Sequence, residues 1–413
     1  MNTGHLLGIL TASLLFSGAG TARADVVTDW NGIMQSTVAT SNAFVQSRSA
    51  AITQLAVFEA VNAIAKRFPP YIGTLWAPAG ASVDAAAIAA AHKALVALHP
   101  AATASLDTAY AAGIQALPDD QSRLDGIAIG EAAANAMLAL RAADGSTAIV
   151  SYVPGADPGD WRPTPPALLP ALLPNWGQVM PFGIDNGAQY RSAPPPALTS
   201  GKYARDYDEV MTVGAVNSTE RTQRLTDIAV FYASSAVQAW NPAARQVSAA
   251  QHRTTAENAR AFAALNMAIA DGLIAVMETK YYYNVWRPVT AIRLGDTDGN
   301  KRTPPDVSWL PLIATPPFPS YPSAHASASG AARAVLEELF GRDGFDVDLT
   351  SSTAPGLVLH YTAWEQITDD IDDARVYGGI HFRYDQEAGG RQGRQVGMDI
   401  VRTFLRGRPK CEE

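Results

Sequence analysis

The spacing of apolar residues along most of the chain follows the three- to four-residue period of an α-helix. Ser41 to Lys66 carries Phe44, Phe58 and Val61 at this spacing, and Pro69-Pro70 follow as a stop. Further helices are predicted over 83–98, 102–117, 119–143, 204–213, 218–239, 254–283, 327–340, 354–377 and 382–405. No convincing alternation of period two predicts strands, and the sequence therefore predicts an all-α fold.

A proline-rich stretch over 145–200 interrupts this helical pattern. Proline lacks the backbone N–H and blocks helix continuation, so no regular structure is expected there. Trp161 and Trp176 make the stretch too apolar for a solvated linker. We expect a long ordered loop that lies on the helical body, between an N-terminal helical bundle over 25–144 and a C-terminal bundle over 201–413.

The first residues have the pattern of a targeting segment. A short apolar stretch from Leu6 to Phe16 leads to Ala22-Arg23-Ala24, which has the A-x-A form of a signal-peptidase site. This predicts a signal peptide over 1–24 and an exported protein, periplasmic or secreted. No other stretch approaches the about 18 uninterrupted apolar residues of a membrane span, so no transmembrane segment is expected in the mature protein.

Composition limits the classes of partner. The chain of 413 residues is 47% hydrophobic and 17% charged, with a formal net charge of −8. An acidic chain without a long Lys/Arg run is not expected to bind nucleic acid or an anionic membrane surface. Its one cysteine, Cys411, excludes an intramolecular disulfide. In a chain that is acidic overall, a local cluster of basic residues is more informative about a binding site than it would be in a basic chain.

Two candidate segments of a functional site lie between residues 280 and 325. Lys280 and Arg287 flank an aromatic run, and Pro288 disfavours helix at Arg287. Ser323-Ala324-His325 follow several prolines and open a helix of small residues. A helix N-terminus binds anions through its unpaired N–H groups. Ser323 is a helix cap or a hydroxyl donor to an oxyanion, and His325 can transfer a proton near neutral pH.

The third segment contains Arg375, the Gly378-Gly379 turn and His381. Asp385 stands four residues beyond His381, a helical spacing at which its carboxylate can reach the imidazole and fix the tautomer. Three permanent cations, two histidines and a small-residue turn are what a phosphate-like or vanadate oxyanion requires.

Together the three segments resemble the superfamily of type-2 phosphatidic acid phosphatases and vanadium-dependent haloperoxidases. The family pattern is K-x6-RP, then PSGH, then SR-x5-H. This chain has Lys280-x6-Arg287-Pro288, Pro322-Ser323-Ala324-His325 and Ala374-Arg375-x5-His381, with alanine in place of glycine at 324 and of serine at 374. The size, the predicted signal peptide and WRPVTAIR are similar to the bacterial haloperoxidase-like branch.

The resemblance implies packed helical bundles with the site in the C-terminal one. It implies vanadate as cofactor, with hydrogen peroxide and halide as substrates and hypohalous acid as product. The family's oxygen-binding positions are Lys280, Arg287, Arg375, Ser323 and the Ala324 N–H. His381 has the position of the axial vanadium ligand, and His325 that of the acid/base. Phe318 has the position of an aromatic residue near the halide.

The halide preference and two alternative functions remain open at this point. Met277 stands where the family's chloroperoxidases carry a tryptophan, which favours bromide over chloride. The same residues also suit a soluble acid phosphatase, in which His381 attacks a phosphate ester and His325 protonates the leaving group. Ala324 is also compatible with a non-catalytic oxyanion-binding protein. Branch resemblance favours the haloperoxidase.

Overall fold

The computed structural model describes residues 25–404 and 406. This part of the chain is 57% helix, with thirteen α-helices and one two-stranded hairpin. The predicted all-α fold is therefore confirmed apart from the hairpin. The predicted signal peptide and Cys411 lie outside the described residues.

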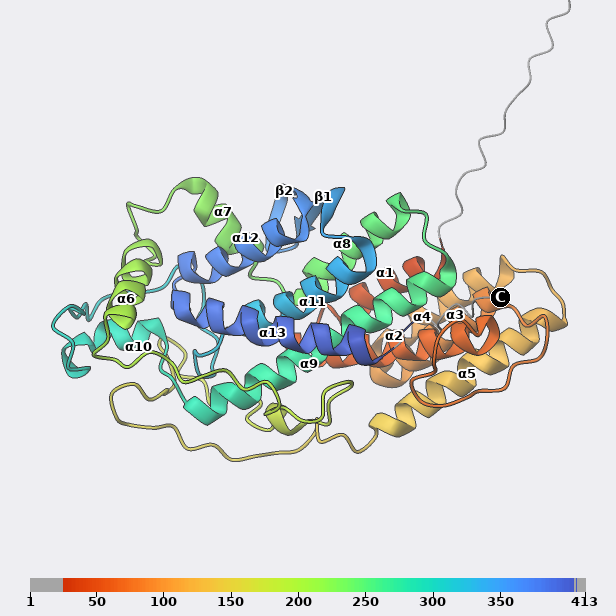
Figure 1. Ribbon diagram of the computed structural model, residues 1–413, viewed down its shortest axis with the longest axis horizontal. Helices are drawn as coiled ribbons and strands as arrows, with labels where there is room; N and C mark the ends of the chain where they lie inside the picture. The colour runs from red at the N-terminus through yellow and green to blue at the C-terminus, as the bar shows by residue number, and fades with distance from the viewer. Residues whose placement is uncertain (1–24, 405, 407–413) are drawn as a thin grey trace, which may run out of the picture.

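Five helices make up the N-terminal part, and they lie at one end of the molecule (Figure 1). They are α1 (Val26–Val38), α2 (Ala43–Ala65), α3 (Val83–Leu98), α4 (Thr103–Gln115) and α5 (Gln121–Arg141), with a short 3₁₀ turn, η1 (Pro100–Ala102), before α4. Side chains of Asn42, Ser82 and Asp120 cap three of them by accepting backbone N–H bonds. Helix α1 was not predicted, although Asp25 caps it and its apolar residues recur at helical spacing.

Eight helices follow in the C-terminal part. They are α6 (Gly201–Val213), α7 (Gln223–Phe231), α8 (Ala236–Ala250), α9 (Thr255–Tyr283), α10 (Pro288–Arg293), α11 (Ala324–Phe340), α12 (Trp364–Tyr377) and α13 (Arg383–Thr403). Helix α9 is long and apolar enough to cross a membrane by length and composition, but 94% of its most apolar window is buried inside the protein. Its hydrophobicity thus belongs to a central core helix.

Two predicted helices are wrong in part. The stretch over 218–239 is broken, because α7 ends at Phe231 and Ser235 caps a new helix, α8. The stretch over 354–377 begins as a strand: β2 (Ala354–Ala363) pairs antiparallel with β1 (Asp343–Ser351), and only then does α12 start. The signal for β1 was a short alternation in which Phe345, Val347 and Leu349 are buried between exposed residues.

The proline-rich segment is an ordered loop, as predicted. It runs along one long side of the molecule between α5 and α6 (Figure 1) and contains only a 3₁₀ turn, η2 (Trp176–Gln178). Trp161 and Trp176 are buried. The carboxylate of Asp271 on α9 accepts the backbone N–H groups of Phe182, Gly183 and Ile184 at 2.7, 2.6 and 3.0 Å. These bonds fasten the loop to the central helix.

One apolar core extends through both halves of the chain, from Val26 on α1 to Ile400 on α13. The predicted boundaries near 144 and 200 therefore separate segments that share a core, and the domain division stays a prediction. Helices α11 and α13 approach closely, because Gly389, Gly393 and Gly397 of α13 face the backbone of α11. This contact sets the two helix N-termini, where two of the three motif segments lie, side by side.

Candidate functional site

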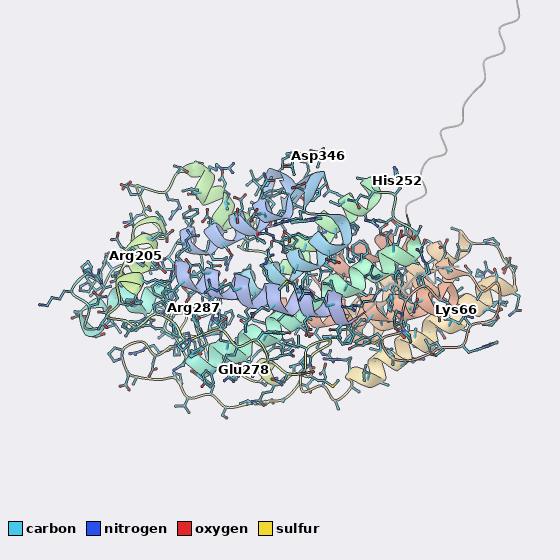
Figure 2. The ribbon with its side chains drawn as sticks, in the orientation of Figure 1. Lys66, Arg205, His252, Glu278, Arg287 and Asp346 are labelled. Carbon is cyan, nitrogen blue, oxygen red and sulfur yellow. The ribbon has the colours of Figure 1, made fainter. Side chains whose placement is uncertain are left out.

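The three motif segments meet around the N-terminus of α11. Lys280 comes from the last turn of α9, and Arg287 is the residue before α10. Ser323 caps α11, Arg375 lies in the last turn of α12, and His381 stands in the turn before α13. Figure 2 shows Arg287 within the body of the protein, whereas Arg205 and Asp346 are at the surface.

Lys280 is fully buried and tied to the loop before α11. Its ammonium group donates to the carbonyl oxygens of Pro319 at 2.8 Å and Ser320 at 2.7 Å. Burial, together with the neighbouring Arg287, lowers the pKa of Lys280 well below its usual value. A nearby anion would offset this cost, so Lys280 is placed as an anion-binding cation.

The two arginines each keep one nitrogen without a partner. Arg287 donates from Nε to the Phe318 carbonyl at 2.8 Å and from Nη1 to the Ile380 carbonyl at 2.8 Å. Arg375 donates from Nη1 to the Tyr232 carbonyl at 2.8 Å. Arg287 Nη2 and Arg375 Nε are buried and find no hydrogen-bond partner among the described residues. Leaving such a donor unpaired costs about 1–3 kcal/mol, so the pair points to a ligand with several acceptor oxygens.

His381 is oriented by a buried carboxylate, as its spacing predicted. Its Nδ1 lies 2.8 Å from Oδ2 of Asp385, which also accepts the hydroxyl of Ser320 at 2.5 Å. Burial raises the pKa of Asp385 to about 6, so the carboxylate is still ionised at neutral pH and His381 donates from Nδ1. Nε2 of His381 is then unprotonated, and its lone pair accepts from Arg287 Nη1 at 3.0 Å, so a ligand bound at Nε2 would replace this bond.

Ser320 was missed by the sequence analysis, although it stands inside the motif loop between Pro319 and Tyr321. Its side chain is fully buried. Its hydroxyl bonds to Asp385, and its carbonyl accepts from Lys280. The partners that hold Arg375 and His325 were missed as well, because they are backbone carbonyls of the 232–235 turn, far away in sequence.

The N-terminus of α11 brings the remaining predicted residues to the site. Ser323 is fully buried, and its Oγ accepts the N–H of Ala326 at 3.3 Å, so the structure shows its capping role. Ala324 is the first helical residue, and its N–H belongs to the group of helix donors that lack an intrahelical partner. Nε2 of His325 lies 3.0 Å from the Ser234 carbonyl.

The basic groups at the site share an excess of positive charge. Burial lowers the pKa of Arg287 to about 9 and that of Arg375 to about 10. Burial and the neighbouring cations also lower the pKa values of His325 and His381 well below 6.5. Asp385 is the carboxylate that raises the pKa values of Lys280 and Arg287. Three buried basic side chains with one carboxylate among them favour a bound multivalent anion, which would stabilise their charged forms.

A cavity of about 330 Å³ is lined by four residues of the site, Ala324, His325, Arg375 and His381. Phe318 also lines it, with its ring centroid 5.2 Å from Lys280 Nζ and 4.9 Å from Arg287 Cζ. Met277 is fully buried in α9 and is not among the lining residues, so its predicted effect on halide preference stays a prediction.

Comparisons with known proteins agree with this geometry. Residues 260–407 match the family model of the VCPO second helical-bundle domain. A crystal structure titled as the first bacterial vanadium-dependent iodoperoxidase superimposes with a TM-score of 0.80 at 27% identity, over 94% of this chain and 97% of that one. The chain is thus similar to vanadium haloperoxidases, in its C-terminal helical bundle by sequence and over most of its length by fold.

Two other known proteins are similar to this chain at lower sequence identity. The vanadium chloroperoxidase of Curvularia inaequalis is 25% identical over 321 residues, which are 57% of this chain and 52% of that protein. The chain thus matches about half the length of this curated relative. A holo-type bacterial vanadium-dependent chloroperoxidase shares the fold, with a TM-score of 0.71 at 18% identity over 88% of this chain and 93% of that one.

The names of these relatives specify vanadium, and the residues present fit its oxyanion, vanadate. The unpaired nitrogens of Arg287 and Arg375 offer two buried donors, and His381 offers an unprotonated Nε2. These are the groups that a tetrahedral or trigonal-bipyramidal oxyanion with one nitrogen ligand requires. The structure therefore brings the residues of the three predicted segments together.

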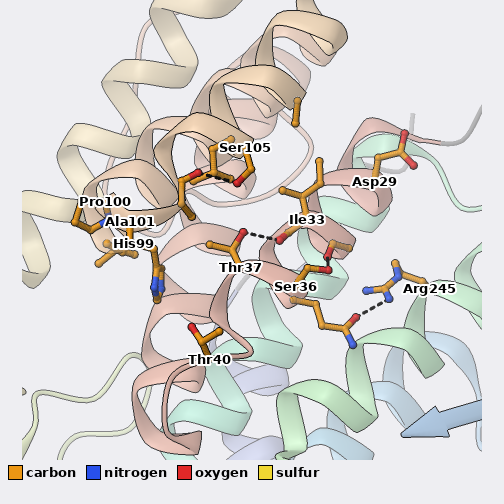
Figure 3. Close-up of a pocket in the computed structure, with 16 residues that line it drawn as sticks. Asp29, Ile33, Ser36, Thr37, Thr40, His99, Pro100, Ala101, Ser105 and Arg245 are labelled. Carbon is orange, nitrogen blue, oxygen red and sulfur yellow. Dashed lines mark hydrogen bonds between the residues drawn. The ribbon is translucent and has the colours of Figure 1, made fainter. Parts of the chain in front are cut away.

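A larger groove of about 1180 Å³ lies elsewhere, between α1 and the turn that joins α3 to α4 (Figure 3). Arg245 stands at its edge and donates to side-chain oxygens of Asn31 and Gln35 at 2.5 and 2.6 Å. None of the predicted site residues lines this groove. The site is therefore identified by its cluster of buried basic side chains, and not by the volume of the cavity.

Proposed function

We propose that this chain is a vanadate-dependent haloperoxidase, which oxidises halide with hydrogen peroxide to hypohalous acid. The observation that carries the proposal is a buried cluster of three side chains. Arg287 and Arg375 each keep a buried nitrogen without a partner among the described residues, Arg287 lies beside the unprotonated Nε2 of His381, and Arg375 lines the same cavity as His381. The chloroperoxidase and iodoperoxidase named among the relatives support the same activity.

Lys280, Arg287 and Arg375 would bind the oxygens of vanadate, with Ser323 and the Ala324 N–H at the end of α11. His381 would hold the anion through Nε2, because Asp385 keeps the proton on Nδ1. When bound, vanadate supplies a Lewis-acidic vanadium(V) centre for peroxide activation. The buried position of all three cations excludes water and strengthens their attraction to the anion.

His325 is the group that can move a proton beside the bound anion. The Ser234 carbonyl can only accept, so Nε2 of His325 carries the hydrogen and Nδ1 is left as the proton acceptor. Its lowered pKa keeps the ring neutral at physiological pH, which suits the acceptance of a proton from peroxide. Phe318 would lie beside the halide.

Parallel assays on orthovanadate-loaded protein test this proposal. We expect vanadate-dependent bromination with peroxide and bromide, and at most weak hydrolysis of 4-nitrophenyl phosphate by the vanadate-free protein. Fast phosphatase turnover without bromination would favour the acid-phosphatase alternative. Vanadate binding without either activity would favour a non-catalytic oxyanion-binding protein. The relatives named above support the first result over these two.

Export to the periplasm or the medium is a further part of the proposal, supported by the Ala22-Arg23-Ala24 sequence. Mass spectrometry of the exported protein should give Asp25 as the first residue. A chain that still carries Met1 in the exported fraction would contradict it.

A further inference from the structure

The turn over 232–235, between α7 and α8, supplies backbone partners to two residues of the site. The Tyr232 carbonyl accepts from Nη1 of Arg375 at 2.8 Å, and the Ser234 carbonyl accepts from Nε2 of His325 at 3.0 Å. A carbonyl group moves with its backbone, so a displacement of this turn would change the direction in which both side chains point. The geometry of the site therefore depends on what holds the turn in place.

Burial alone does not fix this turn. Tyr232 is buried, but Ala233 is exposed, and Ser234 and Ser235 are only partly buried. A segment with few buried contacts opens more readily than the core around it. Ser235 is fastened to α2, because its hydroxyl donates to Oε1 of Gln46 at 2.5 Å. The other contacts that hold the turn come from the β1–β2 hairpin and from α12.

A chain of hydrogen bonds joins the side chain of Tyr232 to α12. Its hydroxyl lies 2.6 Å from the hydroxyl of Tyr361 on β2, which donates to Oδ2 of Asp370 on α12 at 2.8 Å. Because the hydrogen of Tyr361 goes to the carboxylate, Tyr232 is the donor in the first bond. Both rings are buried, and burial raises the pKa values of both phenols, so both keep their hydrogens at physiological pH.

Two further hydroxyl groups of the hairpin hold the backbone that leads into the turn. Ser351, at the end of β1, and Thr353, between the strands, donate to the Phe231 carbonyl at 2.8 and 2.9 Å. Phe231 directly precedes Tyr232. Figure 1 shows the hairpin beside α12, and β2 contacts both α7 and α12. The hairpin therefore holds the backbone before the turn as well as the Tyr232 side chain.

Helix α12 holds Tyr232 at two points. The Tyr232 carbonyl accepts from Arg375, and the Tyr232 hydroxyl is joined through Tyr361 to Asp370, on the same helix. Nε of Arg375 is the buried nitrogen that has no partner among the described residues. The position of Tyr232 therefore sets the direction of the donor that Arg375 offers to an anion.

From these observations we infer that Tyr361 and Asp370 are positioning residues for the anion site. Neither lines the cavity that His325 and Arg375 share. They act through Tyr232, whose carbonyl orients Arg375 and whose turn carries the acceptor for His325. The inference rests on the proposed function for its effect on turnover, whereas the effects on vanadate affinity and on the His325 ring are measured without turnover.

The first test is calorimetric titration of vanadate-free variants with orthovanadate. Tyr361→Phe removes one hydroxyl and keeps the packed ring, and we expect it to bind vanadate about three- to tenfold more weakly, the effect of losing an ordinary hydrogen bond. Asp370→Ala should change the affinity in the same direction. Asp370→Asn keeps a side-chain oxygen that accepts from Tyr361, so it should recover most of the affinity and identify the hydrogen bond as the cause.

Tyr71→Phe is the matched control for a general loss of stability. The Tyr71 hydroxyl donates to the Phe182 carbonyl at 2.7 Å, and its ring packs against Phe404, at the opposite end of α13 from His381. Removal of this hydroxyl should lower thermal stability in the same way as Tyr361→Phe does. It should leave the vanadate affinity and the turnover at the parental values.

Nitrogen NMR of vanadate-free protein with isotopically labelled histidine adds a signal that a loss of stability alone does not change. The His325 signals are assigned by their absence in His325→Ala. In the parent and in Tyr71→Phe, the ring should be neutral with its hydrogen on Nε2, because the Ser234 carbonyl accepts it. In Tyr361→Phe, displacement of this carbonyl should let part of the population carry the hydrogen on Nδ1, so the two nitrogen signals should move toward each other.

The outcomes separate this inference from the proposed function. Parental vanadate affinity and a parental His325 spectrum in Tyr361→Phe would overturn the inference, and so would equal losses of affinity in Tyr361→Phe and Tyr71→Phe. If the parent binds vanadate without bromination, while Tyr361→Phe weakens this binding and alters the His325 ring, the proposed function fails and the positioning role stands. If the parent binds no vanadate, the His325 spectrum decides.

Discussion

Among the places where this protein buries charged side chains, two differ in whether those charges are satisfied. Asp271 on α9 is fully buried, and its two oxygens accept three backbone N–H groups of the proline-rich loop. At the N-terminus of α11, Arg287 and Arg375 are just as buried, but each keeps an unpaired nitrogen. A buried charged group whose hydrogen bonds are all made within the protein stabilises the fold. Buried charged groups that lie together and keep unpaired donors indicate a ligand site.

The largest effect is expected from the histidine at the centre of the incomplete site. His381→Ala removes the only ligand nitrogen that Asp385 orients, so vanadate should no longer be retained after gel filtration and any turnover should be lost. His325→Ala should keep vanadate and lose about 10²- to 10⁴-fold in turnover, as is usual for a general acid or base. Equal, mild effects of both changes would show that the roles are misassigned.

At Asp271, whose hydrogen bonds are complete, we expect a mutation to lower stability and not ligand binding. Asp271→Ala leaves the N–H groups of Phe182, Gly183 and Ile184 unpaired beneath the loop, and the free energy of unfolding should fall by on the order of 3 kcal/mol. Urea unfolding measures this loss. Asp185→Ala, an exposed aspartate of the same loop, is the matched control and should change stability by less than about 0.5 kcal/mol. If both variants unfold alike, the carboxylate does not anchor the loop.

Mutations at Ala324 test whether its backbone N–H, at the N-terminus of α11, contributes to the anion site. Ala324 is the first residue of the helix and Ser323 is extended, with φ −71° and ψ 128°, so proline is tolerated at 324. Ala324→Pro should therefore fold normally and weaken vanadate binding by about 1.5–3 kcal/mol, the value of a charge-assisted bond. Ala324→Gly keeps the N–H and should stay within about tenfold. A folded proline variant with parental affinity would exclude this donor from the site.

The addition of one methyl group at Gly393 tests whether the close contact of α11 and α13 positions the site. A methyl group at Gly393 would overlap the carbonyl oxygen of Ser327, so Gly393→Ala must push α13 away from α11. We expect a loss of about 1–3 kcal/mol in stability and weaker vanadate binding, because His381 and Ser323 then separate. Gly390→Ala meets no atom within 4 Å and should be neutral or stabilising. Thermal unfolding and titration of the two variants decide this.

Much of the site could be predicted from the sequence, because the intervals between the motif residues indicate which side chains lie close together. His381 lies just before α13 and Asp385 in the first turn of that helix, so the four-residue interval is short enough to bring their side chains into contact. Backbone partners carry no such signal: the Tyr232 carbonyl that holds Arg375 lies 143 residues away, and any residue type has a carbonyl. Ser320 was missed because a serine beside prolines is ordinary turn chemistry.

The fold was predicted where apolar periodicity is long, as in α2 and α9. It was missed where tertiary contacts override a short pattern. The β1–β2 hairpin is stable because Phe345 and Val347 pack into the main core, with Phe345 4.2 Å from the ring of Trp364. An isolated hairpin of this size has little stability of its own, so its sequence alone gave a weak signal.

Calorimetric titration of the vanadate-free protein with orthovanadate tests the central claim most directly. Because unpaired donors and lowered pKa values at Lys280, Arg287 and Arg375 all favour an anion, we expect saturable binding of one vanadate per chain, accompanied by a rise in thermal stability. No saturable binding below millimolar concentration, in protein shown to be folded, would contradict the account of this site.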